Sequence, residues 1–260
     1  MVTSSLVCGA QEDTRDLGPR PVPRRSRAGN TVLSAMSDTA FAALDPALRE
    51  ERFSKGMILW KAEESSRVYF PLSGLISILS GTKEAGIQVG CVGRESAAGL
   101  SRGSQVFTTA MVQVAGIFAS LPAARFWSAA ADRPELQSVA RWCSEWLLLQ
   151  AQRNAACNAV HDAEQRLCRW LLQVADRAGR EIFATQEEIA QMLGLRRTTL
   201  TLIAHKLQVN GLISYRRGMI VLRDVTQLEP LACDCYRIQS QLAWTAERIS
   251  SERPGIRQGV

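Results

Sequence analysis

Residues 185–222 read "TQEEIAQMLGLRRTTLTLIAHKLQVNGLISYRRGMIVL", two apolar helical patterns on either side of one glycine, followed by two short β-prone runs. Thr185 and Glu188 have the spacing of a capping box, which marks the start of a helix. Gly194 permits the positive φ that a tight turn between helices requires, and a second helix is expected over about 196–209. The runs on either side of "RRG" predict two short strands. Together these signals predict a helix-turn-helix followed by a wing.

The second helix of this stretch begins with side chains that donate hydrogen bonds and continues with an apolar face of Leu200, Ile203 and Leu207. Arginine can pair bidentately with guanine, threonine hydroxyls can reach phosphates or bases, and a helix N-terminus favours phosphate nearby. We therefore predict that this helix enters the major groove of DNA and that the wing arginines contact the backbone. The predicted DNA-binding residues are Thr185, Gln186, Arg196, Arg197, Thr198, Thr199, Thr201, His205, Arg216 and Arg217. The plain structural alternative is a helical hairpin with a solvated basic face.

The positive charge of the chain is concentrated in the same region. The 260 residues carry a formal charge of +6, and the isoelectric point is about 9.2. Residues 180–223 hold seven Arg and Lys residues against three Glu residues, a net charge of +4. A basic patch attracts a polyanion, which favours nucleic acid as a partner. Because the sequence shows neither a signal-peptide pattern nor an apolar stretch of membrane-spanning length, we expect a cytoplasmic protein without a membrane partner.

The composition changes along the chain in a way that predicts an α+β protein. Residues 1–29 are rich in Pro, Arg, Ser and Gly, which predicts a disordered basic tail. Short β-prone runs separated by glycines predict a small antiparallel barrel or jelly roll within residues 30–132, acting as a sensor domain. An uninterrupted helical pattern predicts one long helix over 133–179. The winged helix-turn-helix is expected at 180–240, with a C-terminal extension at 241–260.

The long helix carries an apolar stripe with a spacing of three to four residues. Two tryptophans on this stripe exceed what a small barrel is expected to cover, so we expect the helix to pair with the same helix of a second subunit. The predicted dimerisation residues are Val139, Trp142, Trp146, Leu149, Arg153 and Val160. Packing of the stripe within its own domain is the alternative.

The element order and several motifs resemble the Crp/Fnr superfamily of bacterial transcription regulators, over roughly residues 30–240. These motifs are "TQEEIAQMLGLRRTTLT" and "KLQVNGLISYRRGMIVL", with "VYFPLSGLISIL", "VGRES" and "HDAEQRLCRWLL". The resemblance implies a cyclic-nucleotide-binding-like jelly roll, a dimerisation helix and a Crp-type winged helix that binds double-stranded DNA. We accordingly expect a homodimer on a pseudo-palindromic operator, with RNA polymerase as a further partner. By match to the family motif, Arg197 and Thr198 lie at base-facing positions and Thr199 at a phosphate-contacting one.

The sequence departs from the cyclic-AMP receptor at positions that matter for this function. Leu202 stands where that receptor has a second base-reading arginine, and Thr198 replaces its glutamate. Leu100 and Thr108 align with the glutamate and the arginine that hold the ribose and the phosphate of cyclic AMP. Because the charged ligand would lack these partners, control by cyclic AMP is not expected, and the effector is left open.

Cofactor chemistry finds little support in the sequence. Seven scattered cysteines indicate reduced thiols, with a reactive thiol sensor as the open alternative. An Fnr-type iron–sulfur cluster needs about four cysteines, mostly in the N-terminal region, and only Cys8 lies there. Cys157 and His161 lie one helical turn apart but do not complete a metal site, and Cys233 and Cys235 are too close for a Cys-x-x-Cys motif. We therefore predict neither a metal nor another cofactor.

Two further interpretations complete the expectations. Arg94 and Glu95 of the "VGRES" motif are interpreted as a salt-bridged turn. Only two histidines occur, and the sequence shows no phosphate loop, nucleophile elbow or dinucleotide fingerprint, so the protein is not expected to be an enzyme. The remaining alternative is a ligand-sensing or adaptor protein whose winged helix contacts protein instead of DNA.

Overall fold

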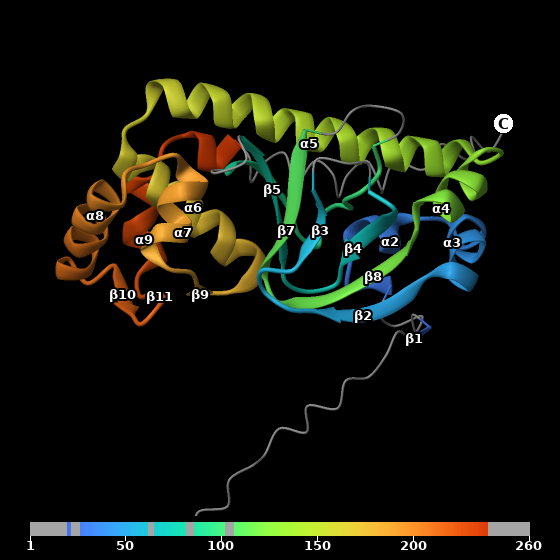
Figure 1. Cartoon of the computed structure of the whole chain (residues 1–260), viewed down its shortest axis with the longest axis horizontal. Coiled ribbons are helices and arrows are strands. Elements are labelled where there is room, and N and C mark those ends of the chain that lie inside the picture. Colours follow the sequence, from blue (N-terminus) through green and yellow to red (C-terminus); the bar gives the residue numbers. More distant parts are fainter. Residues whose placement is uncertain (1–19, 22–26, 62–64, 82–85, 102–106, 239–260) are drawn as a thin grey trace, which may run out of the picture.

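The structure, a computed structural model, describes residues 20–21, 27–61, 65–81, 86–101 and 107–238 (Figure 1). Helix α5 (Pro134–Val160) runs along the upper side of the view in Figure 1. The β-sheets lie beneath one half of this helix, and a smaller, mainly helical domain lies beneath the other half (Figure 1). Most of the predicted tail and the whole predicted C-terminal extension lie outside the described residues.

Two antiparallel sheets of four strands each form the N-terminal domain. Phe118 from one sheet packs in a common core with Ile76 and Ile78 from the other. The predicted α+β class with antiparallel β-structure at the N-terminal side is confirmed. The first sheet has the strand order β1 (Arg20–Pro21), β2 (Arg49–Phe53), β8 (Gly116–Pro122) and β4 (Arg67–Pro71). The second sheet has the order β3 (Ile58–Lys61), β7 (Thr108–Val114), β5 (Leu75–Gly81) and β6 (Gly86–Val92). Short helices accompany this barrel, namely α2 (Thr31–Ala35), α3 (Asp38–Leu44), η1 (Asp45–Ala47) and α4 (Ala123–Ala130).

Residues 27–29, the last part of the predicted tail, are held in place by hydrogen bonds. The Nη1 atom of Arg27 donates a hydrogen bond to Asp38 Oδ1 over 2.7 Å. Asn30 is fully buried; its side chain caps α2 and donates to two carbonyl oxygens of the barrel. These contacts hold residues 27–29 against the barrel, so this part of the tail prediction is corrected.

The predicted long helix is two helices, because the chain leaves the helical conformation at His161 and Asp162. Helix α5 ends at Val160, and α6 covers Ala163–Ala178. The Asp162 side chain accepts a hydrogen bond from the Gln165 backbone N–H (2.8 Å), and the Gln165 side chain accepts one from the Asp162 N–H, which forms a capping box. The sequence signal was the motif "DAEQ", which the uninterrupted apolar spacing obscured.

Helix α6 shares one hydrophobic core with the winged helix rather than with α5. Leu171 of α6 belongs to the same buried cluster as Ile189, Leu200 and Ile220. The C-terminal domain therefore begins near residue 162 instead of residue 180. Its further elements are β9 (Glu181–Phe183), α7 (Gln186–Leu193), α8 (Arg197–Val209), β10 (Ile213–Arg216), β11 (Met219–Leu222), α9 (Val225–Leu228) and η2 (Glu229–Leu231).

The sheet of the predicted wing has a third strand, β9, for which the sequence shows no clear pattern. Strand β9 pairs antiparallel with β11, and the buried Ile182 lies opposite Ile220. The wing strands β10 and β11 thereby extend a sheet of order β10-β11-β9. This sheet fixes the wing to the start of the helix-turn-helix, since β9 leads directly into the cap of α7.

Candidate nucleic-acid interface

The turn between α7 and α8 has the geometry that the sequence predicted. Thr185 caps α7 by accepting a hydrogen bond from the Glu188 N–H (3.2 Å), and Glu188 accepts one from the Thr185 N–H (2.7 Å). Gly194 ends α7 in the left-handed region with φ of 61°, and the next residue, Leu195, donates its N–H back to Ala190. The capping box and the glycine thus set the angle at which α8 leaves α7.

Helix α8 presents one face to the core and the other to solvent. Leu200, Ala204 and Leu207 are buried against α6 and α7. On the opposite side, the predicted DNA-binding residues Arg196, Arg197, Thr198, Thr201 and His205 are exposed, and Thr199 is half-buried. The amphipathic division therefore places the donors of the helix on the surface of the domain.

Two of the exposed donors already have partners on α7 or nearby in the chain. The Arg197 Nε lies 3.7 Å from Glu187 Oε2, in an ion pair whose two side chains are both more than two thirds exposed. Such a pair contributes about 0 to 1 kcal/mol, so little free energy opposes the transfer of Arg197 to another acceptor. Thr201 Oγ1 donates to the Gln186 side chain over 2.7 Å. Of the residues predicted to bind DNA, Gln186 thus links α7 to α8, and Thr185 caps α7.

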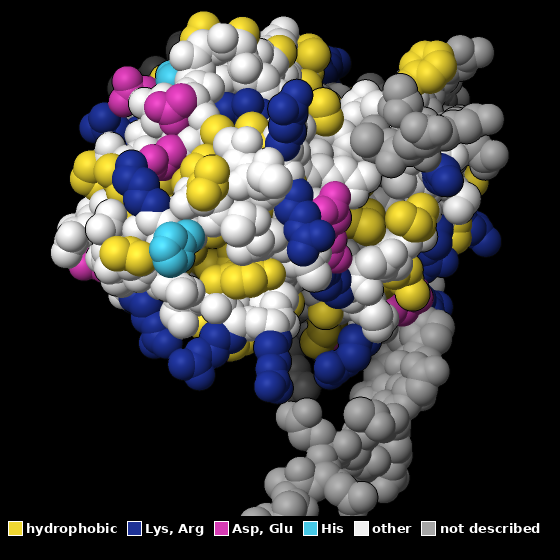
Figure 2. Space-filling model, turned by 60° about the vertical axis from the view of Figure 1, so that its left-hand side comes forward, with side chains coloured by type: hydrophobic (Ala, Val, Ile, Leu, Met, Phe, Trp, Pro, Cys, Tyr) yellow, Lys and Arg dark blue, Asp and Glu magenta, His cyan; other side chains and the backbone are white. Residues whose placement is uncertain are grey.

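The wing brings two further cations to the same end of the molecule. Arg216 ends β10 and Arg217 lies in the turn to β11, and both are exposed. Arg217 has a positive φ of 47° and Gly218 follows with φ of 79°, which turns the chain tightly. Figure 2 shows Lys and Arg side chains gathered along the lower edge of this end of the molecule. Four of the predicted cations therefore project from α8 and the wing.

Leu202 is a residue of this surface that was not among the predicted contacts. It lies on α8 between Thr201 and Ile203, and its side chain is 71% exposed. A large apolar side chain at the centre of a polar helix face has no folding role here, because nothing in the described chain buries it. The sequence signal was its alignment with a base-reading arginine of the cyclic-AMP receptor.

The predicted dimerisation residues of α5 differ in what they offer to a second subunit. Trp146 is only 5% exposed and stacks on Trp142, with ring centroids 6.3 Å apart. Val139 and Trp142 pack against the core of the short N-terminal helices, and Leu149 and Arg153 are half-buried. The large apolar side chains of α5 that remain exposed are Val160 at 72% and Leu148 at 58%. Much of the predicted stripe is therefore covered within the chain, whereas Leu148, which was not among the predicted residues, is exposed.

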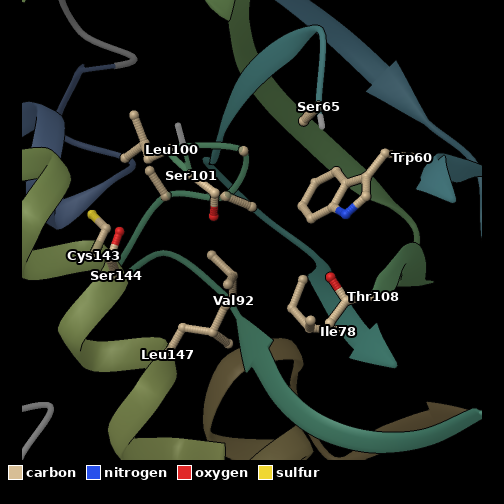
Figure 3. Close-up of a pocket in the computed structure, with 13 residues that line it drawn as sticks. Trp60, Ser65, Ile78, Val92, Leu100, Ser101, Thr108, Cys143, Ser144 and Leu147 are labelled. Atoms are coloured by element: carbon tan, nitrogen blue, oxygen red, sulfur yellow. The ribbon is translucent and has the colours of Figure 1, made fainter. Parts of the chain in front are cut away.

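A cavity lies between the barrel and α5 (Figure 3). Leu100 and Thr108, which align with the cyclic-AMP contacts of the resembling family, both line it. Cys143, Ser144 and Leu147 of α5 close the opposite side, as Figure 3 shows. The other lining residues are Trp60, Ser65, Ile78, Val92, Ala97, Ala98, Gly99 and Ser101. None of the described residues around the cavity carries a charge.

Polar contacts connect the barrel to the C-terminal domain. The Arg177 Nε of α6 pairs with Glu95 Oε1 over 2.9 Å, and both side chains are at least 85% buried. Burial acts to lower the pKa of Arg177, but the Glu95 carboxylate outweighs it and raises that pKa. Arg94 instead donates to the carbonyl oxygen of Gly29. The predicted ion pair within the turn is thus wrong, because Glu95 turns toward α6.

Two more contacts cross the same boundary. Trp170 Nε1 donates to the Gln88 side chain over 2.7 Å, and Gln88 in turn donates to Ser77 in the barrel interior. Lys55 in the turn after β2 donates to Glu188 at the start of α7 over 2.9 Å. A conformational change in the barrel could therefore be transmitted directly to α6 and α7 through these hydrogen bonds.

Comparisons with known proteins agree with this geometry. Residues 165–231 match the Crp-like helix-turn-helix domain, and the match begins within α6. A structure assigned to a transcriptional regulator of the Crp/Fnr family from Eubacterium rectale is 18% identical, with a TM-score of 0.62 over 78% of this chain and 98% of that chain. FixK2 from Bradyrhizobium japonicum is 16% identical, with a TM-score of 0.61 over 72% and 98%. A Crp/Fnr-family regulator from Thermus thermophilus is 22% identical, with a TM-score of 0.58 over 70% and 97%.

These likenesses establish the Crp/Fnr fold and the Crp-like helix-turn-helix domain of this chain, which confirms the resemblance inferred from the sequence. No curated protein matches the sequence. Among the described helices, none combines the length and the apolar character needed to cross a membrane.

Proposed function

We propose that this chain, with its Crp-like helix-turn-helix domain, is a cytoplasmic transcription regulator that binds double-stranded DNA sequence-specifically. The observation that carries the proposal is the face of α8. The N-cap residue Arg196 and the N-terminal half of α8, with Arg197, Thr198 and Thr201, are exposed, while the opposite face of the helix is buried in the domain core. Arg197 pairs with guanine in the major groove, and the exposed Leu202 contacts a thymine methyl group. Arg216 and Arg217 contact phosphates beside the recognition helix.

The protein acts as a homodimer on a pseudo-palindromic operator. Two copies of α8 enter successive major grooves, about 34 Å apart between half-site centres. The exposed Leu148 and Val160 on α5, together with the partly covered stripe of predicted residues, supply the contact between subunits. RNA polymerase is the further partner expected of a regulator that activates transcription.

Cyclic AMP does not control this regulator. The support is the cavity against α5, where Leu100 and Thr108 replace the ligand-binding glutamate and arginine of the cyclic-AMP receptor. A cyclic phosphate buried there would lose its hydrogen bonds to water without gaining a charged partner. The uncharged lining favours a largely apolar effector or a barrel without one.

Selection of binding sites from a random duplex pool, followed by anisotropy titrations at two salt concentrations, tests the proposal. We expect an enriched inverted repeat whose affinity falls steeply with salt. Binding without enrichment would indicate that an effector is required for specificity. If the chain bound no duplex at either salt concentration, the winged helix would be a protein-contacting module instead.

A further inference from the structure

Four side chains that the sequence separates into two pairs meet in the structure. Cys157 and His161 lie at the C-terminal end of α5, and Cys233 and Cys235 follow η2. Their three sulfur atoms and one imidazole nitrogen all lie within 4.8 Å of one another. The Cys157 and Cys233 sulfurs are 3.5 Å apart, and the Cys235 sulfur lies 3.8 Å from His161 Nδ1. We infer that these residues form a tetrahedral site for a single zinc ion.

The distances between these atoms fit one bound metal ion better than a disulfide. A tetrahedral ion with metal–sulfur bonds of about 2.3 Å keeps its ligand atoms about 3.8 Å apart, close to both measured separations. A disulfide needs two sulfurs about 2.05 Å apart. The four ligand atoms of this cluster instead all lie within 4.8 Å of one another, as donors around one metal ion do. Three cysteines and one histidine are an established donor set for structural zinc.

The surroundings of the cluster suit a buried site of net negative charge. The three cysteines are buried, and His161 is half-buried. Three thiolates around a divalent cation leave one negative charge, which requires a nearby cation. Arg169 of α6 interacts electrostatically with all three thiols, and its Nη1 is fixed by a hydrogen bond to Asn154 Oδ1 over 2.7 Å. Its buried Nε has no hydrogen-bond partner within the described chain.

The position of the site gives the ion a mechanical role. Cys157 precedes the break between α5 and α6 and His161 lies within it, whereas Cys233 and Cys235 follow the end of the winged helix. The ion therefore ties the last turn of α5 to the far side of the C-terminal domain, across the junction that sets the angle of α8. Metal occupancy favours one orientation of that domain, and its effect on DNA affinity rests on the proposed function.

The metal content of the full chain tests the site directly. Protein purified under reducing conditions is expected to contain about one zinc per chain by elemental analysis. Replacement of zinc by cobalt(II) is expected to give the visible d–d bands of a tetrahedral site and a sulfur-to-cobalt charge-transfer band. Cys235→Ser and Cys157→Ser lose the metal, whereas the matched control Cys143→Ser, a buried cysteine of α5 outside the cluster, retains it.

Two further variants distinguish loss of the metal site from unfolding of the protein. His161→Cys keeps four donors, with a thiolate in place of the imidazole, and is expected to keep the ion, whereas His161→Ala weakens its binding while circular dichroism stays unchanged. Reduced protein that binds no ion even with added zinc would overturn the inference. Iron accompanied by acid-labile sulfide would overturn it as well, because that finding replaces a single ion with a cluster.

The consequence for DNA is measured separately on the selected duplex. Removal of zinc by a chelator is expected to lower the affinity about five-fold or more, since coupling between sites typically amounts to about 1 to 3 kcal/mol. Equal affinities of the zinc-loaded and zinc-free protein would refute the mechanical role and leave the site in place. A zinc-loaded chain without DNA affinity would instead refute the proposed function.

Discussion

Replacement of Arg197 by alanine isolates the contribution of one predicted base contact. Arg197 is the first residue of α8, and the described partner of its side chain is the exposed Glu187, 3.7 Å away. Alanine has high helix propensity, and exposed substitutions change the free energy of unfolding by less than about 0.5 kcal/mol. The variant is therefore expected to fold and melt like the parent protein, so that a change in DNA affinity reports the contact itself.

The magnitude follows from the geometry of the pair and the symmetry of the operator. One bidentate arginine–guanine contact contributes about 1 to 3 kcal/mol of base discrimination. A homodimer loses two such contacts, about 4 kcal/mol at the middle of that range, so Arg197→Ala is expected to weaken binding by at least about 2 kcal/mol once the pair with Glu187 is subtracted, which is roughly thirty-fold. The loss of the surface pair with Glu187 offsets at most about 1 kcal/mol per subunit. Specificity at one base pair of each half-site is expected to relax.

Anisotropy titrations on the selected duplex, and on duplexes changed at single positions, measure both effects. Arg125→Ala provides a matched control, because Arg125 is an exposed helical arginine of α4 and Figure 1 places α4 and α8 at opposite ends of the molecule. The assignment of α8 as the reading helix would fail if Arg197→Ala left affinity and base preference intact. It would fail more clearly if Arg125→Ala were the variant that weakened binding.

Three other changes probe the wing, the domain boundary and the helix cap. Arg216→Gln combined with Arg217→Asn, which tolerates the positive φ at 217, is expected to reduce the slope of log affinity against log salt by about 3.5 for a dimer, with unchanged base preference. Glu95→Ala leaves Arg177 buried without its partner and is expected to lower the free energy of unfolding by about 3 kcal/mol in urea titrations, whereas Glu95→Leu with Arg177→Met restores most of it. Burial alone would raise the pKa of Glu188, but the Thr185 N–H and the Lys55 ammonium lower it below the usual glutamate value. Its stabilising effect is thus present above about pH 4.5 and lost as pH falls through the lowered pKa, so the stability difference between the parent protein and Glu188→Gln should shrink between about pH 5 and pH 3.

Sequence patterns could predict the winged helix because its signals are local. The Thr185 cap, the Gly194 turn and the alternation of buried and exposed residues on α8 each act within a few positions. The break at Asp162 is also local, but its capping box was hidden by an apolar spacing that continues across it. The burial of Trp146 and the turn of Glu95 toward Arg177 depend instead on which elements pack together, and no local pattern contains that information.

The thiol and imidazole cluster shows the same limit and why the break in the helix matters. Cys157 and Cys233 lie 76 positions apart, and neither half of the cluster has the spacing of a complete metal motif. A continuous helix over 133–179 would carry α6 straight on from His161, and the segment after η2 could not return to the end of α5. Because Asp162 caps a new helix, α6 folds back and the winged helix brings Cys233 and Cys235 to the break. Asp162, which starts the new helix, and the four residues of the cluster are thus parts of one junction between α5 and the C-terminal domain. Zinc bound at this junction would control the angle at which α8 meets DNA.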